Sequence, residues 1–319
     1  YYPPFLWQND RRVYLDNELL PPGTPLDAGA DPYDPRSYDK YTQRTYSPDA
    51  MYDQVLRFVN ANKERPFFLM WTTPIPHSPM QAPDADVQYY VRKFGDEQPI
   101  EGKGYFPSRW PRATYAAMIT YFDRQIRLGI WENTVIVITS DNGPASNSCS
   151  SSEWFDSAHP FRSGKGWGKS SLREGGIRMP FIVAWGGKLR PQVSDHIGYF
   201  PDVMPTLCEL AGVEPPATDG ISFLPTLEGR RQPQHEYLYW EFPGSKGWVA
   251  VRWGEWKGLL RRVKEGNDRF ELFNLRDDPR EEHNLAAQHP EIIDRMWQFV
   301  SASHTEPANP KFRMEIGRK

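Results

Sequence analysis

Cysteine is scarce in this chain, which has only Cys149 and Cys208 among its 319 residues. The two lie far apart in unlike contexts, so the sequence has no disulfide framework and no zinc motif built from cysteine pairs. Long apolar runs are also missing, since none approaches the roughly 20 residues that are needed to span a bilayer. The cysteines therefore indicate no compartment, and the sequence predicts no membrane span.

An excess of charge of one sign is absent too. Lys and Arg total 38 against 41 Asp and Glu, which gives a net charge of -3. This balance predicts no general attraction to nucleic acid or to an anionic membrane, so an anion site must be built locally. The sequence also has no internal repeats and no low-complexity tract, which excludes solenoid and fibrous proteins.

Apolar residues and prolines are plentiful. Hydrophobic residues make up 39% of the chain, enough for a sizeable core, and 31 residues are proline, about twice the average usage. The prolines gather in residues 1–49 and 74–111, which predicts long ordered loops over a scaffold. The segment Tyr1–Trp7 has neither an initiating Met nor a basic leader, so we expect the chain to begin inside a longer protein.

Three short apolar runs stand out, at Phe67–Trp71, Val135–Thr139 and Phe181–Trp185. None shows the alternation of a half-exposed strand, so each is predicted to be a strand that is buried on both faces.

Helical patterns separate these runs. A helix is predicted from Ser47, a second over residues 115–128, and a third over about 202–210 that is closed by Gly212. Strands that alternate with helices predict an α/β fold class, with a mostly parallel sheet sandwiched by helices.

The pattern changes after about Arg231. Aromatic, alternating segments at 237–242, 248–253 and 270–275 predict a small antiparallel sheet, and Ile292, Met296 and Phe299 mark one face of a terminal helix. We therefore predict two domains, the first over residues 1–231 and an α+β subdomain over residues 232–319.

The segments next to the apolar runs hold the candidate functional residues, because ligands of open parallel sheets bind beyond the carboxyl ends of the strands. A proline-stiffened loop after the first run presents His77, and Asp141 and Asn142 follow the second. A glycine-rich stretch with Lys165 and Lys169 precedes the third. Each feature also has a simpler interpretation.

Asp141 and Asn142 offer the oxygen ligands that Ca²⁺ or Mg²⁺ prefers, although Asp-Asn-Gly is equally typical of a turn. His77 is a candidate functional histidine, or else a surface or packing residue. Lys169 lies where the backbone can approach an anion, or else is simply solvated. Together the four predict a cation, an ammonium and an imidazole around a tetrahedral oxyanion, for which sulfate and phosphate esters both fit.

At these residues the chain resembles the formylglycine-dependent sulfatases of the alkaline phosphatase superfamily, in particular bacterial arylsulfatases and N-acetylgalactosamine-6-sulfatases. The similarity extends over nearly the whole chain. The segments that carry it are Pro66–Leu69 with Pro76–Pro79, Asn133–Gly143, Lys169 with Glu174–Pro180, and Phe270–Leu275 with Asp278, Pro279 and Glu281–Leu285.

The resemblance implies a role for each candidate residue. Asp141 and Asn142 would bind calcium, with Mg²⁺ as the alternative, while His77 and Lys169 would hold the sulfate group and stabilise charge on the leaving oxygen. Lys165 is the other candidate for the lysine role. Lys169 is preferred because, like the family's lysine, it stands five residues before the glutamate of Glu-Gly-Gly, whereas Lys165 stands nine before.

The chain departs from the family pattern in two places. The family's formylglycine arises within a Cys/Ser-x-Pro-x-Arg motif, which neither Cys149 nor Cys208 carries. We therefore expect the nucleophile, with further calcium ligands, in an N-terminal segment outside this chain, and we expect the chain alone to be inactive. In addition, only ten residues separate Asp123 from Thr134, where the family has a longer helix, so we expect a missing stretch near Arg127.

The resemblance implies a sulfuric ester hydrolase that acts on a sulfated carbohydrate or aryl sulfate, in the periplasm or secreted. Trp240, Phe242 and Trp248 could stack on sugar rings, although core packing explains them equally well. Two alternatives stay open at this stage: a phosphate mono- or diester hydrolase of the same superfamily, and a noncatalytic remnant that binds calcium without turnover.

Overall fold

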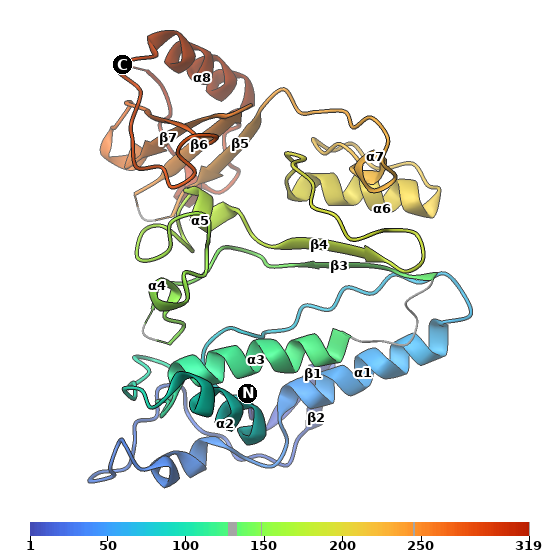
Figure 1. Cartoon of the computed structure of the whole chain (residues 1–319), viewed down its shortest axis with the longest axis vertical. Coiled ribbons are helices and arrows are strands. Elements are labelled where there is room, and N and C mark those ends of the chain that lie inside the picture. Colours follow the sequence, from blue (N-terminus) through green and yellow to red (C-terminus); the bar gives the residue numbers. More distant parts are fainter. Residues whose placement is uncertain (127–132, 148, 245, 319) are drawn as a thin grey trace. The chain divides into compact units, whose positions relative to one another are not determined.

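The computed structural model describes residues 1–126, 133–147, 149–244 and 246–318 (Figure 1). They form two compact units, one of Tyr1–Ile130 with Asn147–Ser151 and the other of Trp131–Ser146 with Ser152–Lys319. The predicted boundary after Arg231 falls inside the second unit and stays a prediction. The expected missing stretch near Arg127 lies outside the described residues.

The first unit is mainly helical. Strands β1 (Phe5–Gln8) and β2 (Arg11–Tyr14) form an antiparallel hairpin, and a 3₁₀ helix follows at Pro35–Tyr41. Three helices complete the unit, namely α1 (Ser47–Asn62), α2 (Asp84–Phe94) and α3 (Pro111–Ile126).

The helices of the first unit form where the apolar spacing places them. The predicted start of α1 at Ser47 is confirmed, with proline in its first turn, and its residues Val55 and Val59 are buried one turn apart. The predicted helix over 115–128 is confirmed as α3, as far as it is described, whereas α2 was not predicted. Ala113 and Ala117 of α3 are fully buried in a cluster with Val87 of α2, because small side chains allow close helix packing.

The predicted strand at Phe67–Trp71 is wrong. These residues form no strand in the described part of the chain, and Phe68 and Met70 are 68% and 73% exposed. Aromatic contacts fix the segment instead, with Phe67 edge-on to Phe58 and Trp71 stacked on Tyr52, both from α1. An apolar run indicates burial but does not specify a hydrogen-bonding partner, and here none of the described strands pairs with it.

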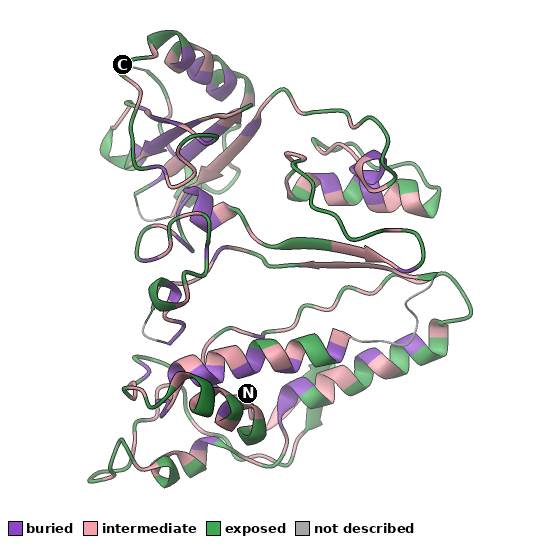
Figure 2. Cartoon of the chain, in the orientation of Figure 1, coloured by how far each residue is buried: buried purple, intermediate pink, exposed green. Residues whose placement is uncertain are grey.

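The second unit begins with β3 (Val135–Thr139) and β4 (Phe181–Trp185), which confirm two predicted strands. They pair antiparallel, with Val137 opposite Val183, so the prediction of a mostly parallel sheet is not confirmed by the described strands. Burial on both faces is also not observed, since Phe181 and Ile182 are 44% and 53% exposed (Figure 2). Periodicity carries no information on strand direction, which explains the difference.

Short helices and turns follow each strand of this pair. Helix α4 (Ser152–Phe155) and helix α5 (Glu174–Ile177) lie between β3 and β4 in the chain. After β4 come a 3₁₀ turn at Phe200–Asp202, α6 (Val203–Ala211) and α7 (Leu224–Leu227). Gly212 ends α6 in the left-handed conformation, with φ of 68°, as its position after the predicted helix indicates.

The C-terminal part is a four-stranded antiparallel sheet in the order β5-β6-β7-β8, with one helix. The strands are β5 (Leu238–Phe242), β6 (Trp248–Trp253), β7 (Trp256–Arg261) and β8 (Glu271–Asn274), and the helix is α8 (Pro290–Ser303). The predicted antiparallel sheet and terminal helix are confirmed, while β7 was not predicted. Ile292, Met296 and Phe299 of α8 are buried against β6, β7 and β8, as their helical spacing predicts.

Candidate active site

The turn after β3 presents two oxygen-bearing side chains. Asp141 is exposed and Asn142 is half-buried, directly beyond the end of the strand. The Ser140 hydroxyl donates to the Asn142 carbonyl at 3.1 Å, which holds the turn locally. The same hydroxyl lies 3.4 Å from Asp141 Oδ1, and the Asp141 side chain is exposed to solvent.

Two backbone hydrogen bonds join this turn to the glycine-rich stretch. Gly143 N donates to the Gly176 carbonyl over 2.9 Å, and Lys169 N donates to the Pro144 carbonyl over 2.9 Å. The structure therefore places the backbone of Lys169 beside the turn that carries Asp141, within the second unit. The side chain of Lys169 is exposed there.

Glycine is required where these segments meet. A Cβ atom on Gly143 would overlap the Gly175 carbonyl oxygen, and one on Gly168 would overlap the Pro144 carbonyl oxygen. Gly175 and Gly176 are enclosed in the same way by carbonyl oxygens of the stretch before them. The glycines of this motif thus allow backbone-to-backbone packing that no larger residue permits.

Lys165 and Lys169 attach to different parts of the unit. Lys165 N donates to the Glu153 carboxylate of α4 at 3.1 Å, whereas Lys169 N bonds to the segment that carries Asp141. Both side chains are exposed. Of the two lysines, Lys169 is therefore the one whose backbone is bonded to the oxygen-rich turn.

His77 lies in the first unit, so its position relative to the other candidates is not defined. Its Nδ1 is 2.8 Å from the Ser78 carbonyl oxygen, which only accepts, so Nδ1 carries a hydrogen. Nε2 of the neutral ring is then an acceptor. The ring is exposed and meets Tyr105 edge-on at 5.9 Å, while His77 N donates to the Pro74 carbonyl over 2.8 Å.

The described residues fit a calcium ion only in part. A carboxylate and an amide oxygen are the donor types that Ca²⁺ or Mg²⁺ takes, but calcium needs six to eight oxygens. No group of three or more His, Cys, Asp or Glu side chains able to hold a metal occurs in the described ranges. Asp141 and Asn142 would supply two ligands, and the others would come from water or from further protein groups.

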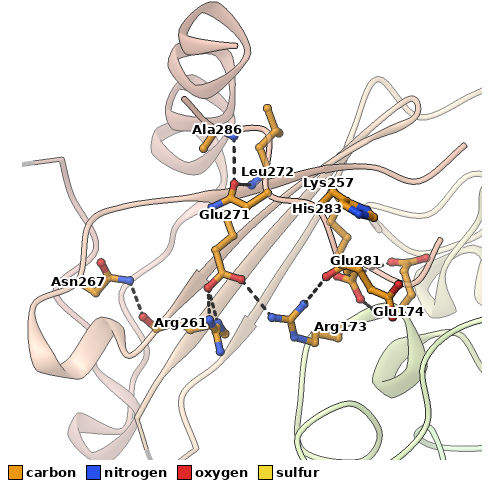
Figure 3. Close-up of polar contacts among 12 residues, drawn as sticks. Arg173, Glu174, Lys257, Arg261, Asn267, Glu271, Leu272, Glu281, His283 and Ala286 are labelled. Carbon is orange, nitrogen blue, oxygen red and sulfur yellow. Dashed lines mark hydrogen bonds and ion pairs between the residues drawn. The ribbon is translucent and has the colours of Figure 1, made fainter. Parts of the chain in front are cut away.

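A buried charge network lies behind the glycine-rich stretch. Lys257 of β7 and Glu174 of α5 are 0% and 1% exposed, and Lys257 Nζ is 2.6 Å from Glu174 Oε1 (Figure 3). Arg178 and Arg252 contact the other oxygen of Glu174 at 2.9 and 3.4 Å. Burial alone would raise the pKa of Glu174, but the Lys257 ammonium and the two guanidinium groups lower it.

Glu281 completes this network. Its Oε2 accepts the backbone N–H of Glu174 at 2.8 Å, while its Oε1 lies 3.6 Å from Lys257 Nζ and has no hydrogen-bond partner among the described residues. Burial raises the pKa of Glu281, and the Lys257 ammonium opposes this shift. The sequence contains Glu174 and Glu281 within family-like segments, but no pattern pointed to Lys257 as their partner.

The sequence matches two family models. A model described as Sulfatase matches residues 9–213, and one described as N-sulphoglucosamine sulphohydrolase, C-terminal, matches residues 165–305. The first covers more than half of the chain. The chain belongs to the sulfatase family.

Curated proteins agree with this assignment. The sulfatase chain is 27% identical to an N-acetylgalactosamine-6-O-sulfatase of Bacteroides thetaiotaomicron, over 81% of this chain and 51% of that protein. It is 26% identical to human arylsulfatase A, over 92% of this chain and 61% of that protein. The chain thus spans about half the length of the curated relatives it matches.

Solved structures show the same fold. The crystal structure of Ps i-CgsB matches with a TM-score of 0.63 at 24% identity, over 82% of this chain and 55% of that one. The structure of BT4656 in complex with its substrate D-glucosamine-2-N,6-O-disulfate matches with a TM-score of 0.61 at 19% identity, over 82% and 70%. These likenesses support an α/β fold of the alkaline phosphatase type for this sulfatase chain.

The three aromatic residues proposed for sugar stacking in this sulfatase chain pack against its core. Trp240 is half-buried and, with Phe242 and Trp248, lies against a buried cluster that includes Leu172 and Leu259. Core packing therefore accounts for all three rings, and the sugar-stacking role of Trp240 stays a prediction.

A cavity of about 350 Å³ lies beside the charge network, lined in part by Arg162, Trp167 and Arg173. Its lining includes none of the predicted site residues, so it is not the candidate active site.

None of the helices in the described ranges is long and apolar enough to cross a membrane.

Proposed function

We propose that the protein containing this chain is a sulfuric ester hydrolase that releases sulfate from a sulfated carbohydrate or an aryl sulfate. The family match and the names of the relatives, which include carbohydrate sulfatases and arylsulfatases, support this class. The observation that carries the proposal is the pair of hydrogen bonds that join the Asp141 turn to the Lys169 stretch.

Each residue has a proposed task. The Lys169 ammonium binds the sulfate oxygens and stabilises the negative charge that moves onto the leaving oxygen, because a fixed cation is most effective where charge develops. His77 keeps its Nδ1 hydrogen on the Ser78 carbonyl, so it acts through Nε2, which when protonated donates to a sulfate oxygen or supplies a proton to the leaving oxygen. Trp240 is proposed to contact the sugar.

Asp141 and Asn142 are proposed to bind Ca²⁺, or Mg²⁺ in its place, with their oxygens. The ion, when bound, would supply fixed positive charge beside the sulfate group. We expect the nucleophile to be a formylglycine outside this chain, since neither cysteine here has the Pro-x-Arg context. By the same resemblance, we expect a periplasmic or secreted protein.

The test measures sulfate release by the complete protein, including any segment that precedes Tyr1. The substrates are 4-nitrophenyl sulfate and a 6-sulfated N-acetylhexosamine, with 4-nitrophenyl phosphate for the phosphate ester alternative. We expect hydrolysis of a sulfate ester, and a loss of about 100-fold or more in kcat/KM for Lys169→Ala. Calcium binding without turnover of any ester would instead select the noncatalytic alternative.

Two further variants separate the roles. Lys165→Ala is the matched control, because it removes an exposed lysine four residues away whose backbone bonds to α4 instead. A loss with Lys165→Ala but not with Lys169→Ala would transfer the anion-binding role to Lys165.

Asp141→Ala should abolish sulfate release and weaken calcium affinity, which calorimetry measures independently of turnover. Unchanged turnover and affinity would reject the metal assignment.

A further inference from the structure

The stretch from Lys169 to Arg178 is held to the C-terminal sheet by both apolar and charged contacts. Leu172 and Ile177 pack in the same cluster as Leu259 of β7 and Phe273 of β8. Beside this cluster, the fully buried Lys257 of β7 reaches Glu174 of α5. The C-terminal sheet therefore places the Lys257 ammonium against the segment that carries Lys169, although the sheet is distant from that segment in sequence.

Glu174 is the residue of α5 whose side chain makes polar contacts. Its two side-chain oxygens bind Lys257, Arg178 and Arg252. Its N–H donates to Glu281, which follows β8 and lies beside Glu174 in Figure 3. A helix of four residues has almost no stability of its own, so these tertiary contacts determine its position.

The position of α5 is passed on to the candidate active site by backbone contacts. The Gly176 carbonyl of α5 accepts from Gly143 N, one residue after Asn142, and Gly143 and Gly168 are in contact with backbone that leaves no room for a side chain. A shift of α5 is therefore expected to move the Asp141 turn and the Lys169 stretch together, because backbones in direct contact leave no free space between them.

We propose that Lys257 and Glu174 are positioning residues, whose buried ion pair sets the relative placement of Lys169 and the Asp141 turn from the C-terminal sheet. Neither residue touches the substrate in this scheme. The kinetic part of the inference rests on the proposed sulfate ester hydrolysis, whereas the structural coupling does not.

A replacement of one partner removes this constraint. Lys257→Met leaves the Glu174 carboxylate buried beside Arg178 and Arg252, and Glu174→Gln leaves the Lys257 ammonium beside Glu281. Each variant removes the 2.6 Å contact between Lys257 Nζ and Glu174 Oε1. One buried charged group thereby loses its nearest partner, so we expect α5 to shift from its position and hydrate that group. Two variants are used so that the test still decides the proposal if one of them gives too little folded protein.

The first readout is amide hydrogen exchange in the complete protein, with no substrate present. In both variants we expect the amides of Gly143, Lys169 and Glu174 to lose protection by about tenfold or more, while those of β6 keep theirs. A uniform loss across the sheet would show a purely stabilising role and overturn the proposal. Unchanged protection at Gly143 and Lys169 would overturn it too.

The second readout is kinetic. We expect kcat for a sulfate ester to fall by about 100-fold with a smaller change in KM, since misplacement of a charge-stabilising group affects the transition state more than the bound substrate. The double variant Glu174→Gln with Lys257→Met should be more stable than either single variant, because neither charge of the pair is left without the other, but it should not recover kcat. Recovery of kcat together with stability would overturn the positioning role.

A matched control lies on the same sheet. Glu241→Gln removes a β5 carboxylate that pairs with His304 at 2.7 Å, and the described residues show no contact between this pair and α5, so it should leave protection at Gly143 and Lys169 unchanged. If the unmodified protein hydrolyses no sulfate ester, the proposed function fails while the exchange result still decides the coupling. If the exchange pattern is unchanged in an active enzyme, only the positioning role fails.

Discussion

At the scale of single residues, the site depends on glycines whose absent side chains make room for backbone. Gly143→Ala would place a methyl group on the Gly175 carbonyl oxygen and break the hydrogen bond from Gly143 N to the Gly176 carbonyl. We expect the free energy of unfolding to fall by about 1–3 kcal/mol, the usual cost of overpacking, as urea denaturation would measure.

Gly317→Ala is the control for this substitution, since a Cβ at Gly317 meets no other atom within 4 Å. It should leave the free energy of unfolding close to that of the unmodified chain. Equal stability of the two alanine variants would mean that the turn after β3 and the Lys169 stretch are not packed as described.

The identities of the site residues could be predicted only where a local pattern carries them. Asp141 and Asn142 stand just beyond a predicted strand, and the family resemblance favours Lys169 by its spacing before Glu-Gly-Gly, so the sequence identifies all three as candidates. Lys257 could not be predicted, because a lysine within an alternating strand is normally on the solvent face. Its burial follows from a charge partner 83 residues away, which no local pattern specifies.

At the scale of elements, Asp202 organises the segment around α6. It is 1% exposed, and its carboxylate accepts from Tyr199 N at 3.0 Å, from Ile221 N at 2.8 Å and from His235 Nε2 at 2.8 Å. His196 lies beside it, and neither ring nitrogen of His196 has a partner among the described residues.

This arrangement predicts that the segment around α6 loses stability in acid. Burial lowers the pKa of His196 below its usual 6.5, with the Asp202 carboxylate opposing the shift and His235 adding to it. Because the folded pKa is depressed, the stability contributed by the neutral ring is present above pH 6.5 and is lost as the pH falls through the folded value. The unfolding free energy should therefore decrease from about pH 7 to about pH 5.

His196→Leu should make this decrease smaller, as urea denaturation at a series of pH values would show. His159→Leu is the comparison variant, since it removes a histidine whose side chain is 75% exposed. An equal decrease in the unmodified protein and in His196→Leu would contradict the role given to His196.

The regular elements could be predicted in part, and the misses have physical reasons. Helices α1, α3, α6 and α8 and strands β3 to β6 and β8 follow from apolar spacing or alternation. The run Phe67–Trp71 has the composition of a strand but no hydrogen-bonding partner among the described residues, and composition does not specify a partner. The apolar patterns likewise do not specify strand direction, so the antiparallel pairing of β3 with β4 is seen only in the structure.

At the scale of the whole molecule, each unit has its own buried clusters. Met118 in the first unit packs with Tyr46, Ile75 and Tyr121, while Met296 in the second packs with Val249 and Leu272 of the C-terminal sheet, and both methionines are fully buried. Because the clusters share no residue, we expect a defect in one to remain in its own unit.

Met118→Ala and Met296→Ala test this expectation. Each leaves a cavity in a closed cluster and should lower the stability of its own unit by about 2–5 kcal/mol. Hydrogen exchange should then show faster exchange in α3 but not in α8 for Met118→Ala, and the reverse for Met296→Ala. Faster exchange of both helices in both variants would instead show that the two units unfold as one cooperative structure, because a cavity in either unit would then lower the single free energy of unfolding that protects both helices.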